Sequence, residues 1–419
     1  MKKKIIENTI PTFLLILFPI SLLIGTAVSE IFIIILVIFF FGNLIKKKEW
    51  YIFNNKLFIL LLLLWFYLII NYLISHFNQN SIFSLRNITF IKYILFTFAV
   101  IYFLRDRDKF KLIFFCWSLI LCVVIIDIYF EFIFGHNLLG LKSSDPTRIG
   151  SFLGEELKVG HFILGFSFLS FGFYLEKYKK KKKQFLTLLI FALLIFASFI
   201  TGERSNFIRT VFCSLIFFTL LNNLSINKKI IFVIISIFLI FLIFNYSQKI
   251  NIRYGPQLLN FVLNKNIIQI FKETQHGAHY KTAIEIFKKN IYFGIGNKQF
   301  RIECNKPDYF NKEYLWSNQR CSTHPHQIYL ELLSEHGLVG TIIILSIIFF
   351  YIFTNAKFFF KNKNYIHLAS IIFTMSIFIP IIPSGSFFTS FSASIFWLNF
   401  AIMNYYSIEK KIFDNKKNF

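Results

Sequence analysis

Charged residues are scarce in this sequence. They make up 16% of its 419 residues, whereas a soluble globular chain carries roughly 25%. Glycine (17) and proline (8) are also few, which excludes a collagen-like or a low-complexity disordered chain. Phenylalanine instead supplies 60 residues, and many continuous apolar runs reach the ~20 residues that a transmembrane helix needs. Because barrel strands are short and alternating, the sequence predicts an all-α polytopic membrane protein and not an outer-membrane barrel.

Motifs for nucleotides and metals are missing as well. The sequence contains no G-x-x-x-x-G-K-[ST], no H-E-x-x-H and no C-x-x-C. Asp106-Arg107-Asp108 has the spacing of metal-dependent sugar-nucleotide transferases, but it lies in a basic turn away from the other candidate residues. His324 and His326 are two residues apart, which is poor spacing for a shared metal on a helix. We therefore predict neither a metal nor a cofactor.

Apolar runs define the expected membrane helices. The first run follows three lysines but is not followed by a small-residue cleavage site, so we expect a retained helix and not a signal peptide. About twelve transmembrane helices are expected, at about 9–29, 31–45, 56–75, 88–104, 110–134, 159–175, 185–201, 206–223, 229–246, 328–355, 365–383 and 386–406.

The positions of the basic residues predict the orientation of these helices across the membrane. The formal net charge is +24, and Lys and Arg collect in short loops on one side, as the positive-inside rule expects, so the charge does not indicate a nucleic-acid partner. The exceptions on the other side are the 136–158 loop, the turn around Arg204 and the segment 247–325, and long loops cross regardless of charge. We predict an inner-membrane protein with both termini in the cytoplasm. The residues behind this orientation are Lys46–Lys48, Arg105, Arg107, Lys109, Lys179–Lys183, Lys228, Lys229, Lys357, Lys361, Lys363, Lys410, Lys411, Lys416 and Lys417.

The predicted organisation has three parts. Residues 1–246 carry nine helices, 247–325 form one large periplasmic loop, and 326–419 carry three helices and a short cytoplasmic tail. Apolar residues at helical spacing between Tyr280 and Phe287 predict an amphipathic helix in the loop. The absence of an internal sequence repeat weakens transporter architectures built from inverted repeats.

A polar stretch opens the tenth predicted helix. Pro325 suits the first helical position and Gln327 the third, so we expect His326 in the first turn at the outer membrane boundary. The positive end of the helix dipole disfavours imidazolium, which would keep His326 neutral and able to accept a proton, and free amides there favour phosphate. The alternative is a histidine pair that only caps a helix.

Two further stretches carry polar residues at the same boundary. Arg204 and Arg209 follow a Gly-Glu turn, where a guanidinium group would clamp a diphosphate or carboxylate, or alternatively serve only as an interfacial anchor. The segment from Arg148 to Glu156 precedes the sixth helix. Its adjacent carboxylates cannot both face one point, so at most one, Glu155, is a candidate, and a plain loop is the alternative.

These stretches resemble the bacterial O-antigen ligase and O-antigen polymerase superfamily. Its pattern is His, then Asn, Ser or Gln, nine residues, Gly, two residues, and Gly, Thr or Tyr. The matching positions here are His326, Gln327, Gly337 and Gly340. The segment 148–156, the Arg204 turn and Phe293-Gly294-Ile295-Gly296 also follow the family's order, so the resemblance covers about residues 145–345.

The resemblance implies a GT-C-like membrane glycosyltransferase. Such an enzyme takes a glycan from an undecaprenyl-diphosphate carrier at the periplasmic face, without nucleotide sugar, metal or cofactor. Arg204 and His326 carry over as the catalytic positions. The second loop arginine of ligases has no certain counterpart, because the expected place reads Gly-Ala-His279-Tyr. This leaves Arg253, Arg301 and Arg320 as substitutes. The full set of substrate-binding candidates is Arg148, Glu155, Arg209, Arg253, His279, Arg301, Arg320 and Gln327.

Several functions remain open. The acceptor is lipid A–core in a ligase and a growing glycan in a polymerase, and the sequence does not choose between them. A transporter or lipid flippase is the alternative from another class, but it should place ionisable groups near the bilayer midplane. Only Lys92, Asp127 and Glu131 stand out near or within the predicted spans.

The five cysteines divide by location. Cys116, Cys122 and Cys213 fall in predicted spans and are expected to pack there, whereas Cys304 and Cys321 fall in the outer loop. Because the periplasm is oxidising, we predict a disulfide between these two, with two free thiols as the alternative.

Overall fold

The structure is a computed structural model that describes residues 2–79, 86–178, 181–221, 225–260 and 263–413. Within these ranges it contains helices and irregular segments and no strand. Lys179, Lys180, Lys416 and Lys417 lie outside them. The α-helices are α1 (Lys2–Ile24), α2 (Thr26–Lys47), α3 (Lys56–Gln79), α4 (Arg86–Thr89), α5 (Ile91–Phe103), α6 (Arg107–Phe134), α7 (Val159–Lys177), α8 (Lys181–Ile200), α9 (Arg204–Leu220), α10 (Ile226–Tyr246), α11 (Gln248–Tyr254), α13 (Ile267–Glu273), α14 (Gln275–Lys289), α15 (Phe300–Glu303), α16 (Ile328–Asn362), α17 (Tyr365–Ile377) and α18 (Ser390–Phe413).

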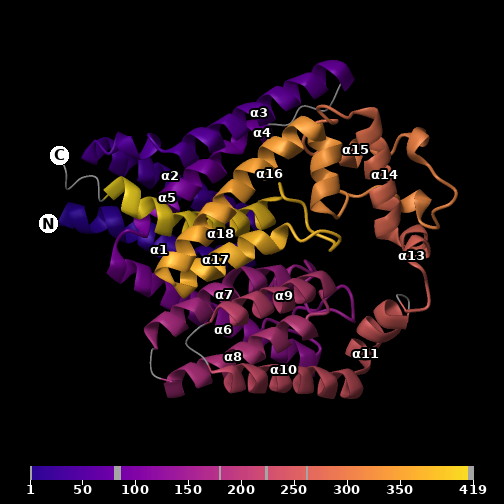
Figure 1. The fold of residues 1–419 in the computed structure, drawn as a ribbon, viewed down its shortest axis with the longest axis horizontal. Helices are drawn as coiled ribbons and strands as arrows, with labels where there is room; N and C mark the ends of the chain where they lie inside the picture. The colour runs from indigo at the N-terminus through magenta and orange to yellow at the C-terminus, as the bar shows by residue number, and fades with distance from the viewer. Residues whose placement is uncertain (1, 80–85, 179–180, 222–224, 261–262, 414–419) are drawn as a thin grey trace.

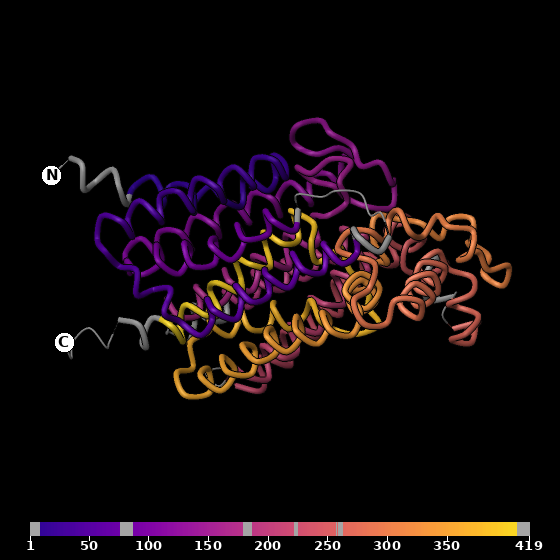
Figure 2. The backbone as a smooth tube through the Cα atoms, turned by 90° about the horizontal axis from the view of Figure 1, so that it is seen from above, coloured from indigo at the N-terminus to yellow at the C-terminus, as the bar shows by residue number. Residues whose placement is uncertain are grey.

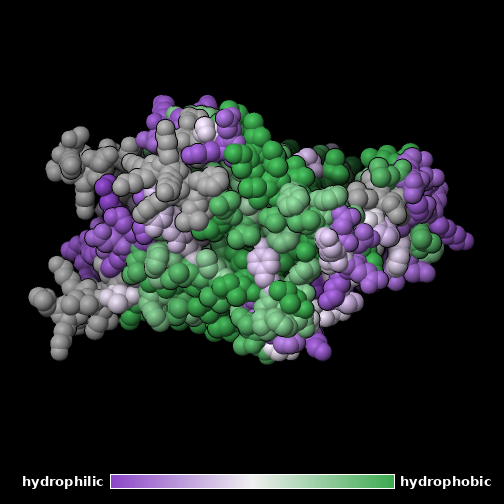
Figure 3. Space-filling view, turned by 90° about the horizontal axis from the view of Figure 1, so that it is seen from below, coloured by the Kyte–Doolittle hydropathy of each residue, from purple (hydrophilic) through white to green (hydrophobic). Residues whose placement is uncertain are grey.

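The prediction of a helical membrane protein is confirmed. Among the described residues, six helices are long and apolar enough to cross a membrane: α2, α3, α6, α7, α10 and α16. Every predicted apolar run overlaps a helix, but the count of twelve transmembrane helices stays a prediction. Figure 3 shows hydrophobic side chains in a broad band across the middle of one face, with hydrophilic side chains toward both ends.

The long helices run side by side along the long axis (Figures 1 and 2). The start of α1 and the end of α18 lie at one end of the bundle, and α13, α14 and α15 lie at the other. Inside the bundle, α7 packs against α17, and α5 packs against α18. At the end of the bundle opposite the termini, α14 packs against α16 and α13.

Two predicted helix boundaries are wrong. α16 begins at Ile328, and Gln327 caps it by accepting a hydrogen bond from the Leu330 amide at 2.8 Å. His326 thus precedes the helix, with a left-handed backbone (φ 60°), and does not lie in its first turn. The second error is the short gap expected between 383 and 386, because α17 ends at Ile377 and α18 begins at Ser390. Two prolines between these residues explain it, since proline cannot continue a helix.

α16 is broken at Gly337, whose backbone is non-helical (φ 62°, ψ −166°). The segment 291–296 supplies the missing hydrogen-bond partners on both sides of the break. Amides of Ile295 and Gly296 donate to the carbonyls of Ser334 and Glu335 at 3.0 and 2.8 Å. Amides of Leu338 and Val339 donate to carbonyls of Ile291 and Tyr292 at 2.8 and 3.1 Å. Buried backbone groups at the break are therefore paired, as a stable membrane interior requires.

Candidate active site

A cavity of about 970 Å³ brings the two predicted catalytic residues together. Arg204, the first residue of α9, and His326, just before α16, both line it. The cavity walls come from many parts of the chain: α2, the 89–93 segment, the 148–161 segment, α9 and the residue before it, α11, α14, the segment 297–301, residues 323–326, and the 383–392 segment before and into α18. Its size is that of a site for a small molecule or part of a lipid-linked sugar.

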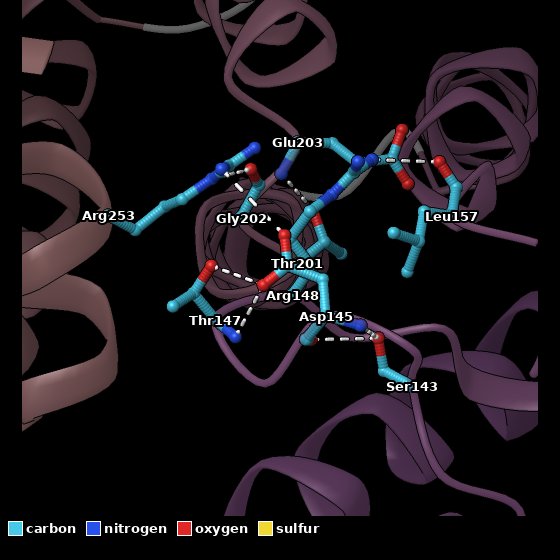
Figure 4. Close-up of polar contacts among 9 residues, drawn as sticks. All are labelled: Ser143, Asp145, Thr147, Arg148, Leu157, Thr201, Gly202, Glu203 and Arg253. Carbon is cyan, nitrogen blue, oxygen red and sulfur yellow. Dashed lines mark hydrogen bonds and ion pairs between the residues drawn. The ribbon is translucent and has the colours of Figure 1, made fainter. Parts of the chain in front are cut away.

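Three arginines gather on one wall of the cavity. We call Arg148, Arg204 and Arg253 the arginine cluster; all three line the cavity. Arg253 Nε donates to the Gly202 carbonyl at 3.0 Å, and Arg148 donates to the Leu157 carbonyl at 2.9 Å (Figure 4). Burial and the charges of Arg204 and Arg148 lower the pKa of Arg253 to about 10. Mutual repulsion of this kind is relieved when an anion binds.

Buried carboxylates hold the loop that presents Arg148. Asp127 on α6 accepts from the Leu138 amide at 2.7 Å, and Glu131 accepts from the Ser151 amide at 2.6 Å. These two acids, noted in the sequence as charges within a span, are therefore anchors for an outer loop. Glu203 plays a similar part before α9: it accepts from the Gly160 amide at 2.7 Å, and burial raises its pKa.

Arg209 lines the cavity, but hydrogen bonds to backbone carbonyls hold its side chain in place. Its side chain is buried and donates to the carbonyls of Ser376 at 3.2 Å and Pro383 at 3.0 Å. It thereby ties α9 to the end of α17 and to the segment between α17 and α18. The two predicted roles of Arg209, a clamp for an anion or an interfacial anchor, stay predictions.

Three histidines surround His326, and all but His279 line the cavity; we call His276, His279, His324 and His326 the histidine cluster. The His326 ring centroid lies 4.2 Å from that of His324 and 5.2 Å from those of His276 and His279. His326 Nε2 lies 3.0 Å from the Ser322 hydroxyl. Among the described residues, no group of three or more His, Cys, Asp or Glu is placed to hold a metal ion.

Hydrogen bonds define the tautomers of two of these histidines. His279 Nδ1 lies 2.8 Å from the Arg320 carbonyl and His324 Nε2 lies 3.2 Å from the Ser384 carbonyl. A carbonyl can only accept, so each of these nitrogens carries a proton. His324 Nδ1 also pairs with the Thr323 hydroxyl at 2.9 Å, which leaves His324 with both nitrogens in use.

The histidine cluster is electrically neutral at pH 7. Burial, and then the charges of the other three histidines, lower the pKa of His326 well below its usual value. Desolvation and its neighbours lower the pKa of His276 to about 4, and burial also lowers those of His279 and His324. The predicted neutrality of His326 therefore has a different cause, because His326 is not at a helical turn.

The remaining predicted substrate-binding residues divide by position. Arg301 lines the cavity, whereas Glu155, His279, Arg320 and Gln327 are not among its lining residues. Glu155 is exposed, and its neighbour Glu156 lines the cavity instead. Arg320 donates to carbonyls of Asn305 and Lys306 at 3.1 Å each, which folds its own loop.

Two parts of the cavity lining were not predicted from the sequence. Lys298, buried at 5% exposure, lines the cavity directly after the Phe-Gly-Ile-Gly stretch. The serine-rich segment 384–392 also lines it, and its Ser384 amide donates to the His326 carbonyl at 2.8 Å. The run of serines after Pro383 was the signal that could have revealed this segment.

Cys304 and Cys321 meet in the loop beside the histidine cluster. Their Cα atoms lie 5.3 Å apart and the structure pairs them as a disulfide. Both pack with Ala283 and Ile286 of α14 in a small separate core. The bridge would tether the chain that leads through Ser322 to His326; its oxidation in the cell stays a prediction.

The family comparison fits this geometry. Residues 189–345 match the family model described as O-antigen ligase. These residues form an O-antigen ligase family domain. The resemblance to the O-antigen ligase and polymerase superfamily is thus confirmed, and the matched segment contains both Arg204 and His326. No curated protein matches the chain. The family implies a glycosyltransferase-like activity of ligase or polymerase type on lipid-linked glycans.

Proposed function

We propose that this protein is an inner-membrane glycosyltransferase. It moves a glycan from an undecaprenyl-diphosphate carrier to an acceptor hydroxyl at the periplasmic face, as an O-antigen ligase does with lipid A–core. The observation that carries the proposal is the shared cavity, which Arg204 and His326 both line. Both residues fall within the matched O-antigen ligase segment.

In the proposed step, the acceptor oxygen attacks the anomeric carbon of the donor sugar. The bond from that carbon to the carrier phosphate breaks, and undecaprenyl diphosphate leaves with the bonding electrons. His326 takes the hydroxyl proton as general base, and Arg204 with Arg148 and Arg253 stabilises the leaving diphosphate. The anomeric phosphate is already an activated leaving group, so the step consumes no ATP.

The lowered pKa of His326 fits a site in which the bound donor substrate supplies negative charge. An imidazole of very low pKa is a weak base, because catalysis works best with a pKa near the working pH. A bound diphosphate adds negative charge to the cavity, and nearby negative charge raises the pKa of an imidazole. Donor binding therefore prepares His326 to take the acceptor proton.

The proposal includes a topology of twelve spans in a GT-C-like arrangement. The start of α1 and the end of α18 are at the end of the bundle opposite α13–α15, which supports cytoplasmic termini and a periplasmic 247–325 loop (Figure 1). Reporter fusions at Asn264, and at Lys417 beyond the described residues, test it. A cytoplasmic signal at Asn264 would contradict both topology and function.

The acceptor separates two candidate activities. A deletion strain of a ligase would accumulate long chains on the carrier, whereas a polymerase mutant would show cores capped with one repeat. Purified protein supplied with a carrier-linked glycan should transfer it to one of these acceptors. Movement of the carrier lipid across vesicles with no transfer to any acceptor would replace the proposal by a flippase.

A further inference from the structure

Lys92 differs from the other two charged residues that were noted near or within the predicted spans. Asp127 and Glu131 hold an outer loop by accepting hydrogen bonds from its amides. Lys92, the second residue of α5, instead forms an ion pair with Glu30 of α2. Both residues line the cavity, and 25% of the Lys92 side chain and 16% of the Glu30 side chain remain exposed. The pair therefore joins two helices and is also part of the cavity wall.

Tyr93 completes this group of side chains. Its hydroxyl donates to Glu30 Oε1 at 2.6 Å, and the Lys92 ammonium lies 5.1 Å from the centre of the Tyr93 ring. Tyr93 also lines the cavity, so we call Glu30, Lys92 and Tyr93 the polar triad. Because the carboxylate and the ammonium compensate each other, the polar triad offers fixed hydrogen-bonding groups without a net charge.

A second ion pair joins the same two helices at their opposite ends. Arg105, just beyond the end of α5, donates to Glu49, just beyond the end of α2, at 3.2 Å. Its guanidinium lies 3.8 Å from the centre of the Tyr102 ring, and the two charged side chains are 21% and 13% exposed. This group has the same kinds of residue as the polar triad, but none of its members is among the residues that line the cavity. It is therefore a matched example of a pair that only holds α2 to α5.

Aromatic rings lie next to the polar triad. The Phe90 ring centroid is 5.7 Å from that of Tyr93 and 5.7 Å from that of Phe388, and all three residues line the cavity. Ser390, the first residue of α18, lines it as well. Ligand sites commonly combine aromatic walls with a few fixed polar groups. A sugar ring matches this combination, because it has C–H groups on its faces and hydroxyl groups at its edge.

We propose that the polar triad binds hydroxyl groups of a sugar ring in a glycan substrate. This inference rests on the proposed transfer reaction, in which the arginine cluster takes the donor diphosphate. A carboxylate accepts and an ammonium donates, so together they can bind neighbouring hydroxyl groups, and hydrogen bonds to charged groups are the stronger kind.

The polar triad and the arginine cluster belong to different elements. α2 and α5 pack against each other and against α18, whereas the arginines come from α9, α11 and the loop before α7. With no net charge, the polar triad does not compete with the arginines for the diphosphate. The hydroxyl groups can belong to the donor glycan or to the acceptor glycan, and the experiment distinguishes these two sources.

Steady-state transfer kinetics with deoxy sugars test the inference. Full-length protein in lipid nanodiscs receives an undecaprenyl-diphosphate-linked oligosaccharide as donor, and a carrier-linked repeat unit or lipid A–core as acceptor. Each glycan is supplied in its natural form and as a set of monodeoxy forms, each of which lacks one non-reacting hydroxyl group. The variants are Glu30→Gln, Lys92→Met, Tyr93→Phe and an exchanged pair, Glu30→Lys with Lys92→Glu. Glu49→Gln, in the matched pair outside the cavity lining, is the control.

In the wild type, one monodeoxy form of one glycan should show a KM about tenfold higher or more, because a hydrogen bond to a charged group is lost. Glu30→Gln or Lys92→Met should raise the KM for the natural form of that glycan by a similar factor. The same variant should add little for that monodeoxy form, since the hydroxyl group is already missing. The KM for the other glycan should stay within about twofold, and Glu49→Gln should change neither. The glycan whose KM responds identifies the source of the hydroxyl group.

Three results would overturn the inference while the function stands. The first is unchanged transfer by all variants of the polar triad. The second is an equal loss for natural and all monodeoxy forms, and the third is full recovery in the exchanged pair, because each would mean that the ion pair only joins α2 and α5. If Glu30→Gln and Lys92→Met do not fold, Tyr93→Phe and the exchanged pair decide by the same comparison. If the wild type transfers to no acceptor, the proposed function itself fails.

Discussion

The arginine cluster and the histidine cluster meet at the same cavity but differ in charge, although backbone carbonyls orient members of both. The arginines keep their charge, and Arg148 and Arg253 are oriented by backbone carbonyls. The histidines lose theirs, because burial and their crowding disfavour imidazolium. A fixed cation and a neutral base are the two groups that the proposed transfer needs. One cavity can supply both only when the two walls differ in this way.

Removing the neutral base should have the largest effect. His326→Ala is expected to lower kcat by about 10²–10⁴, the usual contribution of a general base. Membrane insertion and protein level should be unchanged. The control is His136→Ala, a histidine outside the cavity lining. Near-normal glycan transfer by His326→Ala at matched expression would remove His326 from the chemistry.

Weakening the arginine cluster tests the other wall. Arg204→Ala should lower kcat/KM for the donor by about 10²–10³, because a cation near the leaving group is lost. Arg204→Lys should restore little, since a point charge does not reproduce the bidentate fork. Arg107→Ala, on the exposed start of α6, is the matched control. If Arg204→Lys restored kcat/KM to the wild-type value, the positive charge alone would account for the role of Arg204.

The two walls should also respond differently to pH. The free enzyme keeps His326 neutral below its ordinary pKa, so kcat/KM should stay flat from pH 7 to pH 5. For an imidazole of ordinary pKa, the fraction in the neutral form would fall about thirtyfold over that range. Arg253, with a pKa of about 10, stays protonated throughout. A fall in rate with a midpoint near pH 6.5 would contradict the neutral cluster.

Much of the fold followed from local sequence signals. Apolar runs located the helices, and Arg204 and His326, which the sequence singled out, line one cavity. Their catalytic roles stay predictions. The place of Lys298 in the cavity wall was not predicted, because it depends on contacts among segments far apart in sequence, with Glu331 and Glu335 on one side and Ser386 on the other. The left-handed backbone of His326 was missed for a similar reason, since its Ser384 contact is not encoded in any periodicity.

A substitution at Gly337, where α16 is broken, tests whether the fold beside the histidine cluster depends on this break. A methyl group at Gly337 would lie 2.3 Å from the Tyr292 carbonyl oxygen, at a backbone conformation that alanine disfavours. Gly337→Ala should destabilise the fold by on the order of 3 kcal/mol. Thermal unfolding in detergent measures this. Gly42→Ala in α2, where nothing lies within 4 Å, should be neutral or slightly stabilising, and equal losses in both would contradict the argument.

A covalent tether is predicted on the histidine wall alone, and its loss should have the smallest effect on transfer. Cys304 and Cys321 are 17 residues apart, so closing the loop would stabilise it by about 3 kcal/mol on the chain-entropy model. Cys304→Ser should loosen the chain that leads to His326, lower kcat by a few fold and leave the KM for donor unchanged, because the arginine cluster lies elsewhere. Cys122→Ser, an exposed thiol on α6, is the control. Alkylation of both loop cysteines without prior reduction would show free thiols, and the tether would then have no part in the difference between the two walls.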